Sequence, residues 1–173
     1  MSRARRPCAL VATAVFALAC NQGLEPSVAG GVCPPGFVGI CGTVKIRGVT
    51  PDSTDFVVVV AFADFPRDTL DLLQFRPVPP VQLPLGDTIA TYRLGLPAGR
   101  YEWVLVVWKK LGAISLANAN TLLREAGFYR DPNNPATRGV VDVSGGQSGV
   151  DFVVDFADMH PVSFWFPPSP APR

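Results

Sequence analysis

The residues best suited to catalysis in this chain are few and widely spaced. His160 is the one histidine, and no catalytic partner for it can be identified from the sequence. Asp151 and Asp155 lie four residues apart on one face of a predicted strand, about 13 Å apart at about 3.3 Å per residue. That spacing is too wide for the paired carboxylates of a glycosidase, so both are expected to be solvated. Nucleophile elbows, zinc-protease helices, phosphate loops and dinucleotide fingerprints are absent from the sequence. We therefore expect no enzyme and no catalytic residue.

A calcium site is the one metal centre that the sequence suggests. Asp131, Asn133 and Asn134 place oxygen ligands within one short segment, and hard cations prefer such ligands. Two prolines interrupt the segment and it holds a single carboxylate, so a plain turn is the favoured interpretation. No metal and no cofactor are expected.

Aromatic residues offer a better lead to a binding site. Trp108 lies near the end of a strongly apolar strand beside Lys109 and Lys110, where partial exposure is expected. Tyr129 leads into the Asp131 turn, and Trp165 lies in the last apolar segment. Packing in the core is the favoured role for each residue type. The alternative is a platform for sugar rings, which makes Trp108, Tyr129 and Trp165 the candidate ligand-binding residues.

The cysteines indicate an oxidising compartment. Cys33 and Cys41 flank a seven-residue segment, with no C-x-x-C motif or neighbouring histidine to indicate a redox or metal role. A spare pair of this kind normally forms a disulfide outside the cytoplasm. We expect a bridge that ties an N-terminal tether to the first strand.

Residues 1–19 have the pattern of a secretory signal peptide. Three arginines precede an uncharged apolar run of twelve residues, which is shorter than the roughly 20 that span a bilayer. The run ends in small residues before Cys20, which resembles the lipobox of bacterial lipoproteins. Cys20 is therefore the predicted lipidation site, and an ordinary signal peptide cut near Ala19 is the alternative. The resemblance, with Asn21 next, implies an exported outer-membrane lipoprotein, on the periplasmic face or at the cell surface, held to the membrane by its lipid anchor.

The body of the chain reads as a series of strands. Alternating or continuously apolar stretches occur at 43–47, 56–63, 89–96, 100–110, 138–143 and 150–156. Residues 162–166 are expected to form a last strand, and 67–74 and 115–126 short helical segments. Four prolines confine 77–84 to a loop or a sheet edge. The sequence predicts an all-β protein, an antiparallel β-sandwich of about seven to eight strands with one or two short helical segments.

Three further boundaries follow from composition. Residues 20–41 form the predicted tether with its disulfide loop, 42–166 the β-sandwich domain, and 167–173 a Pro-rich tail.

A family resemblance lies in the segment Tyr92-Arg-Leu-Gly-Leu-Pro-Ala-Gly-Arg-Tyr101. A strand of the form Y-x-L that leads into an L-P-A-G-x-Y turn resembles the carboxypeptidase regulatory-like, or transthyretin-like (prealbumin-like), β-sandwich. The resemblance implies a non-catalytic module used for spacing, adhesion, or contact with a glycan or another protein.

Charge and composition narrow the class of partner. The chain has 173 residues and a formal net charge of +1, which excludes nucleic-acid binding through a bulk positive field. Its 48% hydrophobic content is enough for a sizeable core. We expect a lipid-anchored envelope module with a binding or scaffolding role and an envelope protein or glycan as partner. A carbohydrate-binding lipoprotein is the alternative.

Overall fold

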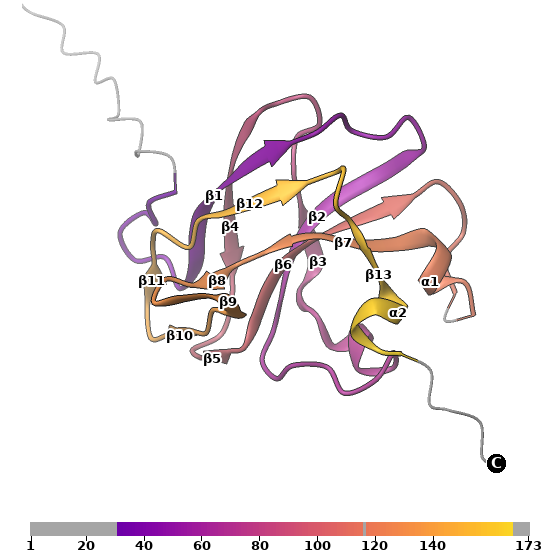
Figure 1. Cartoon of the computed structure of the whole chain (residues 1–173). Coiled ribbons are helices and arrows are strands. Elements are labelled where there is room, and N and C mark those ends of the chain that lie inside the picture. Colours follow the sequence, from indigo (N-terminus) through magenta and orange to yellow (C-terminus); the bar gives the residue numbers. More distant parts are fainter. Residues whose placement is uncertain (1–30, 116, 168–173) are drawn as a thin grey trace, which may run out of the picture.

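The computed structural model describes residues 31–115 and 117–167 (Figure 1). The predicted leader 1–19, Cys20 and residues 168–173 of the Pro-rich tail lie outside the described residues. Strands make up 49% of the described residues and helices 9%, which confirms the all-β prediction. None of the helices in the described ranges combines the length and apolarity that a membrane span requires.

The first sheet is built around β1 (Gly39–Arg47). β4 (Ile89–Gly95) pairs with β1 in antiparallel register, with Ile40 opposite Leu94. β12 (Phe152–Asp155) and the short β11 (Gly146–Gln147) pair with the other side of β1, and both are parallel to it. The sheet is therefore mixed, because the last long strand returns in the same direction as the first.

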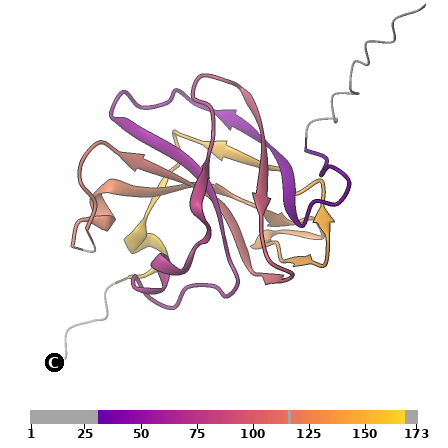
Figure 2. The ribbon, with the colours of Figure 1, turned by 180° about the vertical axis from the view of Figure 1, so that it is seen from behind.

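The second sheet has five strands in the order β13-β7-β6-β2-β3, all antiparallel. Their bounds are β2 Thr54–Phe62, β3 Arg76–Gln82, β6 Trp103–Lys110, β7 Leu123–Phe128 and β13 His160–Pro161. The proline-rich segment forms the edge strand β3, as predicted, since proline has no N–H for a second ladder. Figure 2 shows this edge, in magenta, from behind.

Short elements connect the two sheets. β5 (Gly99–Tyr101) pairs with β10 (Val141–Val143), and β8 (Arg130–Asp131) forms a hairpin with β9 (Asn134–Arg138). The described helices are single turns: η1 Asp71–Gln74, α1 Ala119–Leu122 and α2 Val162–Trp165.

The main core lies between the sheets. Val44, Val57, Val104 and Val154 are fully or almost fully buried there. The strict alternation predicted for 150–156 is confirmed, because Val150, Phe152, Val154 and Phe156 are all buried. The two sheets approach each other at both edges, β7 against β12 and β3 against β4. At the first edge, a Cβ on Gly127 would lie 2.1 Å from the carbonyl oxygen of Val153, so only glycine allows this approach.

Two local predictions are wrong. Residues 115–126 were expected to be helical, but the helix ends at Leu122 and Leu123–Phe128 is a strand. The ladder that β6 offers to this segment outweighs its helix propensity. Residues 162–166 were expected to be a strand, but Val162–Trp165 is the helical turn α2, which lies against the outer face of the second sheet.

The predicted disulfide is present. Cys33 and Cys41 are bonded with their Cα atoms 5.3 Å apart, and Cys41 is fully buried. β1 begins at Gly39, so Cys41 lies inside the first strand and not in the tether. The bridge holds the segment before β1 against β11, where Cys33 Cβ is 2.7 Å from the position of a Cβ on Gly146.

Candidate functional site

The described part of the chain contains a large apolar pocket on the outer face of the five-stranded sheet, opposite the main core. Its floor consists of the alternate residues of two neighbouring strands that point away from that core. The rungs of this floor are the cross-strand pairs Phe56–Lys109, Val58–Val107, Val60–Leu105 and Phe62–Trp103. Both faces of these strands are apolar, so this sheet requires a cover on each side.

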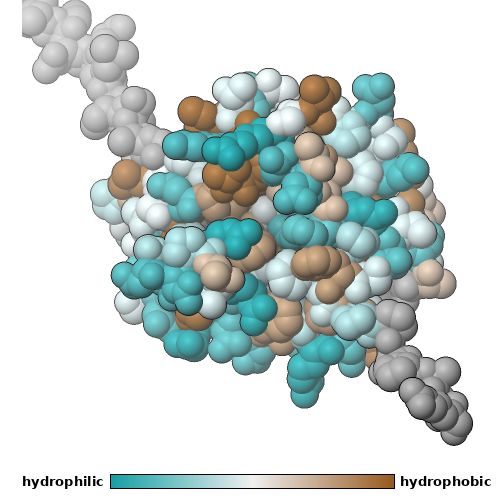
Figure 3. Space-filling model, in the orientation of Figure 1, coloured by the Kyte–Doolittle hydropathy of each residue, from teal (hydrophilic) through white to brown (hydrophobic). Residues whose placement is uncertain are grey.

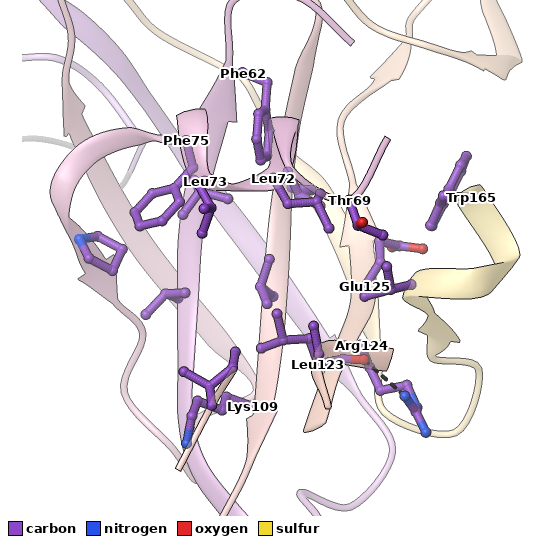
Figure 4. Close-up of a pocket in the computed structure, with 18 of the residues that line it drawn as sticks. Phe62, Thr69, Leu72, Leu73, Phe75, Lys109, Leu123, Arg124, Glu125 and Trp165 are labelled. Carbon is purple, nitrogen blue, oxygen red and sulfur yellow. Dashed lines mark hydrogen bonds between the residues drawn. The ribbon is translucent and has the colours of Figure 1, made fainter. Parts of the chain in front are cut away.

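Three segments cover the floor and enclose a cavity of about 470 Å³ (Figure 4). The η1 segment contributes Leu72, Leu73 and Phe75, and the chain after β6 contributes Ile114, Ala119 and Leu123. α2 closes the far end with Val162, Trp165 and Phe166. Ligand pockets in proteins typically have volumes of about 300–1,000 Å³ and mostly apolar walls, so this cavity is of ligand-binding size.

The mouth of the pocket lies between the η1 segment and the loop after β6. Thr69 and Leu73 on one side and Ile114 and Ser115 on the other line the pocket and are also exposed to solvent. Leu73 is 63% exposed and Ile114 49%, so an apolar side chain borders the opening on each side. On the face drawn in Figure 3, by contrast, hydrophilic residues predominate and apolar ones are scattered.

The basic side chains in the pocket wall already have partners. The Lys109 ammonium is nearly buried and donates to the Asp55 carboxylate and to the carbonyls of Lys110 and Gly112. Arg124 donates to the carbonyls of Asn120 and Leu123. Neither cation is therefore free to recognise an anion inside the pocket.

The buried acid in the wall is paired as well. Glu125 in β7 lies 2.8 Å from Nδ1 of His160 in β13, and the Glu125 side chain is 5% exposed. Burial raises the pKa of Glu125 above its usual value, and the hydrogen bond and charge of His160 offset part of this rise. This pair joins β13 to β7 and so positions α2 over the end of the pocket.

An aromatic cluster forms that end of the pocket. The Trp103 and Trp165 rings lie 5.3 Å apart, and Phe65 packs on both at 5.1 and 6.2 Å. Phe128 meets Trp165 edge to face at 5.6 Å. The indole N–H groups of Trp103 and Trp165 are buried and make no hydrogen bond within the described residues. Apolar packing therefore dominates this end.

The three predicted ligand-binding residues do not come together. The expected exposure of Trp108 is wrong: it is 5% exposed, packs in the main core, and donates to the Thr54 hydroxyl at 2.7 Å. Its position in β6 turns it to the inner face, in phase with Val104 and Val106. Tyr129 is half-buried against the main core, and Trp165 alone of the three lines the pocket.

The remaining candidate polar groups have structural partners. Asp151 accepts a 2.6 Å hydrogen bond from the Thr43 amide. The Asp131 carboxylate accepts one from the Asn133 amide at 2.8 Å, which is the turn geometry favoured from the sequence. Within residues 31–115 and 117–167 no three His, Cys, Asp or Glu side chains gather as a metal site would require.

Comparison with known proteins adds no relative: no family model, curated protein or solved structure matches this chain. The site is therefore interpreted from its own geometry. A largely apolar cavity with partnered charges and an open mouth is suited to holding an apolar molecule by burial of surface.

Proposed function

We propose that this chain is a lipid-anchored, non-catalytic binding module of the cell envelope, and that its binding site is the apolar pocket on the outer face of the five-stranded sheet. The cavity of about 470 Å³ is the observation that carries this proposal. Burial of apolar surface contributes roughly 25 cal/mol per Å², so a pocket of this kind retains a hydrophobic small molecule without a specific polar contact.

The envelope location is supported by two independent features of the chain. The leader pattern of residues 1–19 and the small residues before Cys20 favour export and acylation. The Cys33–Cys41 disulfide fits an oxidising compartment.

Binding to a neutral fluorescent probe tests the pocket directly. N-phenyl-1-naphthylamine is uncharged and fluoresces strongly once it leaves water, so saturable emission is expected on titration with the full-length protein. Val107 is half-buried in the floor of the pocket, and Val107→Trp fills the space with a larger ring. We expect Val107→Trp to abolish the emission.

A matched control separates a filled pocket from general disturbance. Val153 lies on the outer face of β12, is 36% exposed and does not line the pocket. Val153→Trp should bind the probe as the wild type does. Equal binding by the wild type and Val107→Trp, or none by the wild type, would contradict the proposed site.

The anchor has a separate test. In a bacterial host, the wild-type chain should fractionate with membranes and Cys20→Ser with soluble proteins. Membrane retention of Cys20→Ser would overturn the anchoring proposal and leave the pocket unaffected.

The carbohydrate alternative has less support in this geometry. Sugar platforms need an exposed aromatic face, and Trp108 is buried. Binding on a glycan array that disappears in Trp165→Ala would restore this alternative. Silence on the array together with probe binding favours the apolar site.

A further inference from the structure

The Glu125 side chain uses one of its two oxygens for the contact with His160. Glu125 lines the pocket (Figure 4), and its Oε2 atom lies 2.8 Å from Nδ1 of His160. The second oxygen, Oε1, has no hydrogen-bond partner among the described residues. In that part of the chain, the side-chain polar atoms that are both unpartnered and fully enclosed are the indole nitrogens of Trp103 and Trp165, so Oε1 borders open space. The side chain is 5% exposed and lines the pocket, so we take that space to be the pocket.

An oxygen in this position is a hydrogen-bond acceptor. Oε2 faces the imidazole, so any proton shared by the pair lies between Oε2 and Nδ1, and Oε1 accepts whichever of the two atoms holds that proton. A buried polar atom without a partner costs free energy, and most such atoms in proteins are satisfied by the chain, by water or by a ligand. Oε1 therefore favours a ligand that brings a donor to it.

Glu125 is also well placed to meet a ligand that rests on the apolar floor. In the pairing of β7 with β6 it lies opposite Val107, and both side chains line the pocket. Directly opposite residues of neighbouring antiparallel strands have their Cβ atoms about 4.5–5.5 Å apart. A hydrocarbon body over Val107 thus needs one substituent to reach Glu125.

We propose that the pocket binds an apolar molecule that carries a hydroxyl group, and that this hydroxyl donates a hydrogen bond to Oε1 of Glu125. The apolar body is retained by burial against the floor, and the hydroxyl fixes its orientation. This inference rests on the proposed function and names the class of ligand for the same site.

The charges of the wall favour a hydroxyl over the other common polar groups. A carbonyl or an ether offers an acceptor to an acceptor, and a carboxylate adds a negative charge beside Glu125. An ammonium group is a donor, but the cations Lys109 and Arg124 line the same pocket, and Glu125 is the one acid among the described lining residues. A hydroxyl brings a donor without a charge.

A series of compounds with one hydrocarbon body and different substituents tests this inference. 1-Adamantanol, 1-methyladamantane, 1-methoxyadamantane and 1-adamantanamine share the adamantane cage. A cavity of about 150 Å³ holds one benzene ring and this pocket has about three times that space, so the cage fits. Each compound is titrated against N-phenyl-1-naphthylamine bound to the full-length protein, below its solubility limit, and its inhibition constant is measured.

Two variants separate the acceptor from the pair that holds it. The ratio of the inhibition constants of 1-methyladamantane and 1-adamantanol measures what the hydroxyl contributes, because the two substituents are of similar size. Glu125→Leu removes the acceptor, and we expect it to lower this ratio about 10- to 100-fold, the value of a hydrogen bond to a charged group. His160→Asn is the matched control. It breaks the same pair but leaves Oε1 in place, so it should retain the wild-type ratio.

The wild type alone gives a second measurement that needs no folded variant. 1-Methoxyadamantane has an oxygen that accepts but does not donate, so the wild type should bind 1-adamantanol at least about tenfold more tightly. Equal binding of these two compounds contradicts donation to Glu125.

The remaining outcomes distinguish this inference from the function beneath it. Failure of N-phenyl-1-naphthylamine to bind overturns the proposed function. Probe binding with the same ratio in the wild type and in Glu125→Leu overturns only the hydroxyl assignment. Tighter binding of 1-adamantanamine than of 1-adamantanol also overturns that assignment, and it indicates an ammonium ligand instead.

Discussion

Gly127→Ala is the sharpest test of how the two sheets meet. Gly127 in β7 lies where the second sheet approaches β12 of the first. A Cβ at this position would lie 2.1 Å from the Val153 carbonyl oxygen and 2.9 Å from Val154 Cα. Both neighbours are backbone atoms, so no side-chain rotation can relieve the contact.

The expected loss of stability is about 3 kcal/mol. A carbon–oxygen contact needs about 3.3 Å, so β7 and β12 must separate by about 1 Å. A gap of that size removes a quarter to a half of the contact energy of the core residues along this edge, among them Phe152 and Val154, each worth about 1.5–3 kcal/mol. Backbone strain adds about 1–3 kcal/mol to this loss. Alanine loses less conformational entropy on folding than glycine, which reduces the loss by about 0.5–1 kcal/mol.

Urea unfolding followed by tryptophan fluorescence measures this loss. Gly95→Ala is the matched control, because Gly95 is also in a strand and a Cβ there would meet nothing within 4 Å. We expect Gly95→Ala to be neutral or stabilising by up to about 1 kcal/mol. If Gly127→Ala unfolds within about 0.5 kcal/mol of Gly95→Ala, the close approach of the two sheets is refuted.

Three further predictions concern the disulfide, the buried acid and a buried hydroxyl. Cys33→Ala/Cys41→Ala should unfold with about 2–3 kcal/mol less free energy than the wild type, since it opens an eight-residue separation, and dithiothreitol should destabilise only the wild type. The pKa of Glu125 is higher in the folded protein than in the unfolded chain. The protonated carboxyl group therefore contributes to stability at a pH below the pKa of the unfolded chain, and this contribution is lost as the pH rises through the pKa of the folded protein. Accordingly, His160→Asn should lose more stability between about pH 4 and 7 than His160→Asn/Glu125→Gln, and equal losses would contradict the raised pKa. Tyr92→Phe removes a buried hydroxyl that donates at 2.6 Å to a backbone carbonyl before β12, and chemical denaturation should show a loss of about 1–2 kcal/mol; an unchanged midpoint would show that this bond contributes nothing net.

Local pattern predicted the strands well, because burial on one face leaves a period of two in the sequence. Tyr92 and Leu94 in β4 and Phe152 in β12 are buried as their alternation indicates. The short elements escaped prediction, because their state depends on distant partners. Leu123–Phe128 has helix-forming residues but becomes a strand beside β6, and the parallel direction of β12 is set by β1, far away in the sequence.

The pocket left a weaker signal in the sequence. The continuous apolar run from Phe56 to Phe62 predicted a strand buried on both faces, which implies that something must cover the outer side. The apolar run does not indicate how closely the covering segments pack on the outer face of the sheet. The cavity arises because the η1 segment and α2 bridge over Val60 and Leu105 and do not fill the space above them, which depends on loop paths that no local pattern encodes.

The parallel pairing of β1 with β12 also governs when the molecule can fold. Val44 pairs with Phe152, so the first long strand to be made obtains one of its two neighbours only after almost the whole domain has been synthesised. Loops of this length must close before the pairing contributes any energy, which is typical of β-proteins that fold in milliseconds to seconds. Until Phe152 is available, the edge of β1 from Val44 to Arg47 has no partner strand, so the first sheet is completed only when the last long strand has been made.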